Sequence, residues 1–157
     1  MSKKSTFQAA SALLSMYGSF FKDVSQDVGL EKAVAWHANQ GKGYGAQFAG
    51  ALKQGMGRKK LNLSTLESVY AKALGLFGIV PKFEKKRSTL SVTVGQCPFY
   101  EGFSNAGLDH KTIELMCSQM AAAEYEVLKN AFPNLSGCVK FRSAPDQACV
   151  EEFVITR

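Results

Sequence analysis

Apolar residues recur along the chain with two different periods, and the change of period divides the chain into two parts. Up to about residue 80 they repeat every three or four positions, which is the period of an α-helix. From residue 86 a strand-like alternation appears, followed by one long helical pattern and two further strand-like segments. The pattern therefore predicts helices first and a mixture of strands and helix afterwards.

Three helices are expected in the first part. One covers residues 6–21 with Ser5 as its N-cap, and the next begins near Asp27. The third opens at 64–67, where Ser, Thr, Leu and Glu have capping-box spacing, and it ends near Gly78. Each helix carries apolar residues on one face, as expected for helices that pack against the rest of the domain.

Three glycines, Gly41, Gly43 and Gly45, interrupt the second helical pattern. They do not match the dinucleotide-binding fingerprint, and no strand precedes them, so a phosphate-binding loop is excluded. Small residues at this spacing permit a bend or the close packing of two helices.

In the second part, a half-buried strand is expected around 89–94, because Leu, Val and Val alternate there with Thr and Ser. A long helix is predicted over 109–128. Two strands, 138–143 and 148–155, form a terminal hairpin around a turn that contains Pro and Asp. One face of the last strand holds Cys149, Glu151, Phe153 and Ile155.

These elements predict an α+β fold. A helical N-terminal half packs on a small antiparallel sheet, with a long helix in the C-terminal half and a terminal hairpin. A chain of 157 residues with 46% hydrophobic content is expected to form one domain over 1–157. Within it, 1–80 is interpreted as a helical scaffold and 85–157 as the portion that carries the four cysteines.

Glu124 is the most informative residue of the long helix. At about 100° per residue it falls near the middle of the apolar stripe, with Cys117 two turns earlier. A carboxylate among methionines and alanines must find a partner, take up a proton or bind something. One interpretation is a solvated crevice or an ion pair with Arg142, and the other is a binding or catalytic site.

The net charge of +6 is unevenly distributed, because the basic excess lies in residues 1–87. Two short basic runs, at 58–60 and 82–87, flank the third predicted helix. They lack interleaved aromatic residues and belong to no recognised DNA- or RNA-binding module, which argues against nucleic acid as a partner. A solvated surface or a weak anionic partner is the favoured interpretation.

The cysteines and the opening residues bear on location. Four cysteines without a CxxC pair indicate a reducing compartment, and Met-Ser-Lys-Lys is not followed by a continuous apolar run. We therefore expect a cytoplasmic protein without a secretory leader or a membrane span. A homo-oligomer is left open.

Cys97 precedes Pro98 at the start of a short predicted helix. An exposed thiol at a helix N-terminus has a lowered pKa, because the helix dipole favours the thiolate. Cys117 is interpreted first as a small core residue, since buried free cysteines are common in cores.

The order of these features resembles the L-2-amino-thiazoline-4-carboxylic acid hydrolase family over residues 85–155. The resemblance rests on a strand leading into Cys97-Pro98, a helix bearing Cys117, a break at 132–134, and a last strand that begins Cys149-Val150-Glu151. The chain departs from the family at two places. Ser118-Gln119-Met120 follows the helix cysteine where an acidic residue is expected, and Cys149-Val150-Glu151 stands where the family has Cys-Asp-Phe.

The resemblance implies hydrolysis of a cyclic thiazoline amidine to a carbamoylated cysteine. Cys97 or Cys117 would attack the amidine carbon and Glu124 would move protons. Arg142 would clamp the substrate carboxylate, with Met120 and Tyr100 beside the substrate.

The chain also resembles the vinyl-4-reductase type of small-molecule-binding domain, in which a glutamate and cysteines can hold zinc. This resemblance implies a tetrahedral zinc site made by Cys97, Glu124, Cys138 and Cys149. An iron–sulfur centre is a weaker alternative, and a Cys138–Cys149 disulfide requires an oxidising compartment. The two resemblances leave a hydrolase and a non-catalytic small-molecule or metal-binding domain as alternatives.

Overall fold

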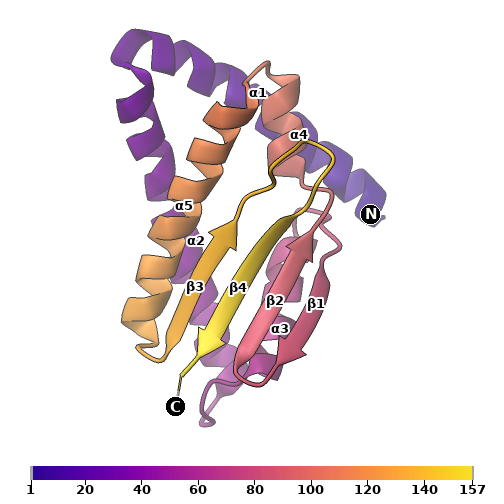
Figure 1. Cartoon of the computed structure of the whole chain (residues 1–157), viewed down its shortest axis with the longest axis vertical. Coiled ribbons are helices and arrows are strands. Elements are labelled where there is room, and N and C mark those ends of the chain that lie inside the picture. Colours follow the sequence, from indigo (N-terminus) through magenta and orange to yellow (C-terminus); the bar gives the residue numbers. More distant parts are fainter. Residues whose placement is uncertain (1, 157) are drawn as a thin grey trace.

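The computed structural model describes residues 2–156 and has an α+β fold. Five helices and four strands follow one another in the order α1 (Lys3–Val28), α2 (Leu30–Met56), α3 (Leu63–Gly75), β1 (Lys82–Lys86), β2 (Thr89–Val94), α4 (Pro98–Asn105), α5 (His110–Ala131), β3 (Leu135–Lys140) and β4 (Cys149–Ile155). The predicted helical N-terminal half, long helix and terminal hairpin are confirmed (Figure 1).

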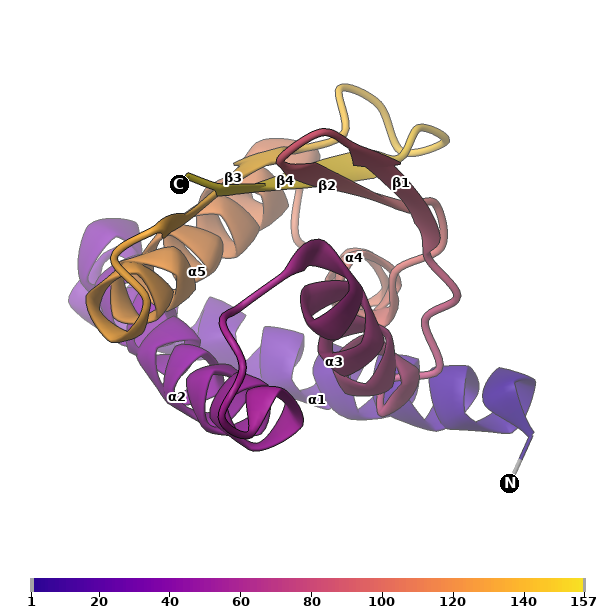
Figure 2. The ribbon, with the colours of Figure 1, turned by 90° about the horizontal axis from the view of Figure 1, so that it is seen from below.

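The four strands form one antiparallel sheet in the order β1-β2-β4-β3. The hairpin strand β4 is therefore central and lies between β2 and β3. Figure 2 shows the sheet as one layer with the helices on one side of it. This arrangement buries one face of the sheet, and exposure alternates accordingly along β2 and β3.

Strand β1 was missed by the sequence pattern. Its five residues, Lys82–Lys86, are mostly exposed, and their apolar content is too low to indicate a strand. β1 lies at the edge of the sheet, and the positive charge of its lysines opposes pairing of this edge with a strand of another chain. Lys85 and Lys86 form ion pairs with Glu67 at 2.7 Å and Glu84 at 2.8 Å. The second basic run is thus part of a solvated sheet edge.

Several predicted boundaries were wrong. The first helix continues to Val28, and Gly29, with φ of 89°, separates it from α2. The second helix is continuous through all three glycines, so they do not bend it out of helical geometry. The third helix is capped by Asn62, whose side chain accepts a hydrogen bond from the N–H of Thr65, rather than by Ser64.

Two clusters of buried residues hold the layers together. One lies between the sheet and helices α2, α3 and α5 and includes Leu52, Leu66, Leu90 and Phe153. The other joins α1, α2, α4 and α5 around Phe103 and Met116. Among residues 2–156, no helix is both long and apolar enough to cross a membrane.

Candidate functional site

A cavity of about 770 Å³ lies between the sheet and helices α2, α3 and α5. Its wall is mostly aromatic and aliphatic, as in small-molecule sites of this size. Besides Lys72, two glutamines and three tyrosines, the polar side chains of the wall are two carboxyl groups, Glu124 and Glu151, and three thiols, Cys97, Cys117 and Cys149. These side chains come from α5, β4 and the start of α4, so residues remote in sequence meet here.

Close packing of α2 against α5 positions Glu124. A Cβ atom on Gly45 would stand 2.7 Å from the main-chain oxygen of Glu124 and 3.0 Å from Cβ of Val127. Only glycine permits this approach, which confirms the predicted use of the glycines for close helix packing. A Cβ atom on the central member, Gly43, would meet nothing within 4 Å, so Gly43 is not needed for this contact.

Glu151 enters the cavity from the central strand β4. It is paired with Val92 of β2 and Val139 of β3, so its side chain lies on the inward face of the sheet. The hydroxyls of Tyr70 and Tyr125 both donate hydrogen bonds to Oε2 of Glu151, the second over 2.7 Å. These two hydrogen bonds occupy the acceptor sites of Oε2 and hold the carboxylate in place, while Oε1 receives neither of them.

Burial raises the pKa of both carboxyl groups. The pKa of Glu124 rises to about 8, first because burial disfavours its charged form and then because of the negative charge of Glu151. The pKa of Glu151 is also raised by burial, but the hydrogen bonds from Tyr70 and Tyr125 offset part of that effect. With a pKa of about 8, Glu124 therefore carries a proton through most of the neutral range.

Neither carboxyl group has a cationic partner among residues 2–156. The ion pair between Glu124 and Arg142 is not formed, and both salt bridges of the described chain lie elsewhere. Lys72 is the one cationic residue in the cavity wall, and it is exposed to solvent. The cavity thus holds two acids in an apolar wall with no protein cation bound to them.

The thiols do not have the predicted reactivity. Cys97 is the N-cap residue of α4, as expected, but it is half-buried rather than exposed. Its pKa is raised to about 11 because burial outweighs the N–H groups of Tyr100 and Phe99 that favour the thiolate. Burial, followed by the nearby thiols Cys97 and Cys149, raises the pKa of Cys117 well above its usual value. The prediction of a low-pKa nucleophile was wrong.

The predicted four-ligand zinc site is not formed. Cys97, Glu124 and Cys149 line the cavity, but Cys138 is paired with Glu152 on the outward face of the sheet. Within residues 2–156, no group of three or more Cys, His, Asp and Glu side chains could hold a metal ion. All four cysteines are free, so the Cys138–Cys149 disulfide is absent as well.

Arg142 has a structural role that leaves little of it free for a ligand. It is 4% exposed, and its Nη1 and Nη2 groups donate to the carbonyl oxygens of Pro145, at 3.1 Å, and Gly95, at 3.0 Å. Its guanidinium carbon lies 4.5 Å from the centre of the Tyr100 ring. Tyr100 and Met120, the other two residues expected beside a substrate, line the cavity, whereas Arg142 holds the adjacent loop.

Sequence reasoning missed three residues that define the site: Glu151, Tyr70 and Tyr125. The signal for Glu151 was present, because a carboxylate shared one strand face with Cys149 and Phe153. The tyrosines had no such signal, since Tyr70 lies 81 residues from Glu151 in the chain. Their convergence depends on the packing of α3 and α5 against β4.

Comparison with known proteins does not assign the chain to a family. No protein-family model matches the chain, and no curated protein sequence gives a significant match to it.

Proposed function

We propose that this protein binds a small organic ligand that has an apolar body and a protonated nitrogen group. The observation that carries the proposal is the pair of half-buried carboxyl groups, Glu124 and Glu151, which line the cavity with no protein cation bound to them. A carboxylate partly removed from water in an apolar wall is costly unless it is paired, and a ligand cation is the partner that this wall lacks.

The chemistry of the pair favours a flat, forked cation such as an amidinium. Oε2 of Glu151 already accepts two hydrogen bonds, which leaves Oε1 for the ligand. Glu124 supplies a second acceptor once it ionises, and a nearby cation would lower its pKa from about 8. Two N–H groups of one amidinium could therefore be received by two carboxylates.

Benzamidinium and its neutral analogue benzamide form a suitable pair of probes for calorimetric titration at pH 8. Benzamidinium should bind at least about tenfold more tightly, because only the cation neutralises the carboxylates. Glu151→Gln and Glu124→Gln should each remove most of this preference. Equal binding of the two compounds by the wild-type protein would contradict the proposal.

Matched controls lie beside each carboxyl group. Glu126 is exposed on α5 two residues after Glu124, and Glu152 is exposed on the outward face of β4. Glu126→Gln and Glu152→Gln change the net charge equally but leave the cavity intact. Both controls should retain the wild-type preference for benzamidinium.

Hydrolysis of a cyclic amidine is a second candidate function, favoured by the raised pKa of Glu124. A carboxyl group with a pKa of about 8 is suited to accept and return protons near neutral pH. In this scheme Glu124 takes a proton from a water molecule that attacks the amidine carbon, and Glu151 holds the protonated nitrogen. The ring C–S bond then breaks, and Glu124 returns the proton to the departing sulfur. The thiols are not required, since the pKa values of Cys97 and Cys117 are raised.

The test of this second candidate is direct incubation with 2-amino-thiazoline-4-carboxylate. Carbamoylated cysteine should appear at a rate that falls about a hundredfold or more in Glu124→Gln. The rate should be unchanged in Cys138→Ser, because Cys138 lies on the other face of the sheet. Absence of product with intact benzamidinium binding would leave the protein as a non-catalytic binding domain.

A further inference from the structure

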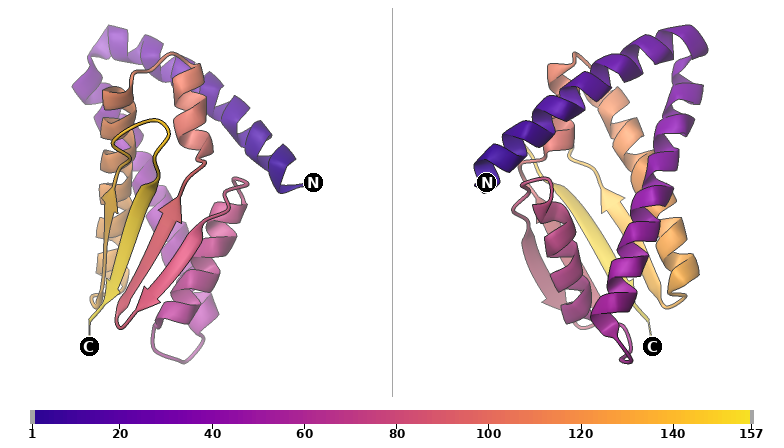
Figure 3. Two further views of the ribbon diagram at one scale, coloured as in Figure 1. Left: turned by 45° about the vertical axis from the view of Figure 1, so that its right-hand side comes forward. Right: turned by 180° about the vertical axis from the view of Figure 1, so that it is seen from behind.

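A second cavity, of about 480 Å³, lies in a groove between α1, α2 and the end of α3. Figure 3 shows α1 and α2 diverging as the two arms of a V, with α3 between them. The walls are mainly small and aliphatic side chains on α1, together with Leu76 and Phe77 beyond the end of α3. The α1 residues concerned are Ala9, Ala10, Leu13 and Leu14.

The groove adjoins the carboxyl-lined cavity. Five residues line both spaces: Tyr44, Leu76, Phe77, Phe99 and Met120. Three of their rings stand in a row, with centroid separations of 6.3 Å between Tyr44 and Phe77 and 5.1 Å between Phe77 and Phe99. The chamber that holds the acids and the chamber that holds none therefore meet at these five side chains.

The groove carries no charge of its own. Its histidine, His37, is 4% exposed, and its Nδ1 is hydrogen-bonded to the hydroxyl of Tyr17 at 3.0 Å. Burial lowers the pKa of His37 to about 4, so the imidazole is neutral. An uncharged, largely apolar occupant is what such a wall accepts.

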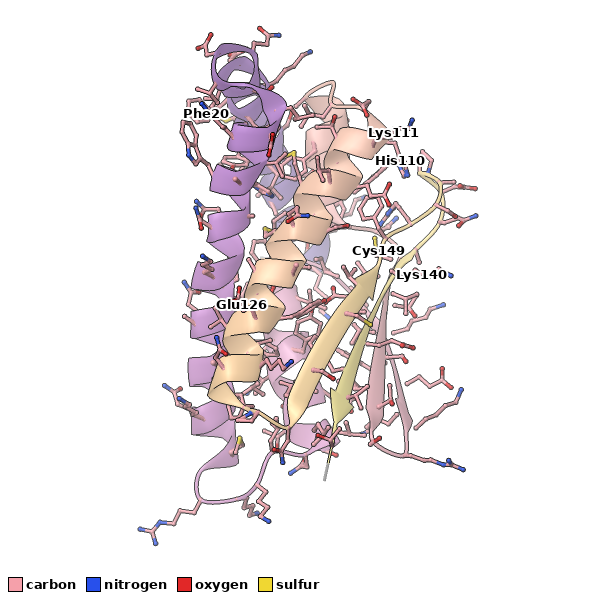
Figure 4. The ribbon with its side chains drawn as sticks, turned by 60° about the vertical axis from the view of Figure 1, so that its left-hand side comes forward. Phe20, His110, Lys111, Glu126, Lys140 and Cys149 are labelled. Atoms are coloured by element: carbon pink, nitrogen blue, oxygen red, sulfur yellow. The ribbon has the colours of Figure 1, made fainter. Side chains whose placement is uncertain are left out.

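Large apolar side chains stand in solvent at the rim of the groove. Leu13 on α1 is 67% exposed and Leu76 is 78% exposed, and both belong to the lining. Phe20, farther along α1, is also exposed on the outside of the helical layer (Figure 4). Contact with an apolar chain in the groove would remove the rim side chains from water.

We infer that the ligand is a cationic amphiphile, whose nitrogen meets Glu124 and Glu151 and whose unbranched apolar tail passes Phe77 into the groove. The inference rests on the proposed function for the head group and adds the class of ligand. Its own support is the shared wall, the absence of charge in the groove and the exposed leucines at its rim.

The experiment uses n-alkylammonium ions of four, eight and twelve carbons, kept below their micelle concentrations and titrated calorimetrically into the wild-type protein. Affinity should rise about fourfold for each methylene group that becomes buried. Alkanoate ions of matched length should bind at least about tenfold more weakly, because the carboxylates repel them.

Ala9→Trp tests the groove, because Ala9 is exposed, lines the groove and does not line the carboxyl cavity. The large side chain should abolish the gain in affinity between eight and twelve carbons and leave butylammonium binding unchanged. Ala12→Trp is the matched control, since Ala12 is exposed on the same helix outside the groove. It should behave as the wild type.

A second measurement does not depend on a variant. Dodecylammonium with a nitroxide at its far end should broaden the backbone amide signals of residues 9–14 in the wild-type protein. Identical chain-length series in Ala9→Trp and wild type, together with no broadening, would overturn the inference. Equal binding of ammonium and alkanoate ions with the Ala9→Trp effect intact would instead overturn the proposed head-group site and leave the tail groove.

Discussion

Gly41 of α2 lies directly against the main-chain carbonyl of Met120 in α5. A Cβ atom on Gly41 would stand 1.9 Å from that oxygen, closer than any real side chain can approach. Four residues later, Gly45 makes the same approach to Glu124. The two glycines thus set the separation of the helices and, with it, the place of Glu124 in the cavity.

Gly41→Ala should lower the free energy of unfolding by about 3 kcal/mol, because the helices must separate to admit the methyl group. Gly43→Ala is the control on the same helix: it faces open space, so better helix propensity should raise stability by about 0.5–1 kcal/mol. Urea unfolding of both variants measures the difference. Equal effects of the two substitutions would show that α2 does not need its close contact with α5.

The fold class and Glu124 could be predicted from the sequence because both rest on local periodicity. A helical stripe with a carboxylate in its centre is visible in any single helix, whatever it packs against. The glycine spacing likewise indicated a close helix contact, although it could not show which helix was the partner. Caps and boundaries were less certain, since Asn62 and Ser64 are both good N-cap residues.

What the sequence did not reveal depends on pairing across long separations. The hydrogen bonds of Tyr70 and Tyr125 to Glu151 exist only because α3 and α5 pack on the same strand. The error at Cys138 was of another kind, because alternation of Leu135, Gly137 and Val139 would have placed Cys138 outward. The error at Cys97 arose because burial in the cavity outweighs the helix N-terminus.

Arg142→Gln should loosen the connection between β3 and β4. The guanidinium bridges the carbonyl oxygens of Pro145 and Gly95, and a shorter neutral side chain cannot reach both. We expect stability to fall by about 2 kcal/mol and amide exchange to accelerate in residues 141–148. Lys140→Gln, at an exposed position on β3, should change neither quantity.

The thiols should differ in reactivity with a disulfide reagent in the native protein at pH 8. Cys138 is exposed on the outward face of the sheet and should react fastest. Cys97 and Cys117 should react slowly, because burial raises the pKa of each thiol. Cys138→Ser should remove the fast phase, whereas a fast phase that disappears in Cys97→Ser would restore the nucleophile hypothesis.

Stability should fall as the pH rises from 5 to 8. The pKa of Glu124 is about 8 in the folded protein, against an ordinary value of 4.5, so the folded state holds a proton that the unfolded state has lost. Between these two pKa values, Glu124 lowers the free energy of unfolding by up to about 1.4 kcal/mol for each pH unit. The raised pKa of Glu151 acts in the same direction.

Glu124→Gln should flatten this dependence without abolishing it, because Glu151 is retained. The variant should be similar to the wild type at pH 5 and more stable by about 2–4 kcal/mol at pH 8, as measured by urea unfolding across that range. Glu126→Gln, on the exposed side of α5, should follow the wild-type curve. A wild-type stability that stays constant from pH 5 to 8 would mean that Glu124 is solvated or paired, and the case for a ligand cation at this site would then fail.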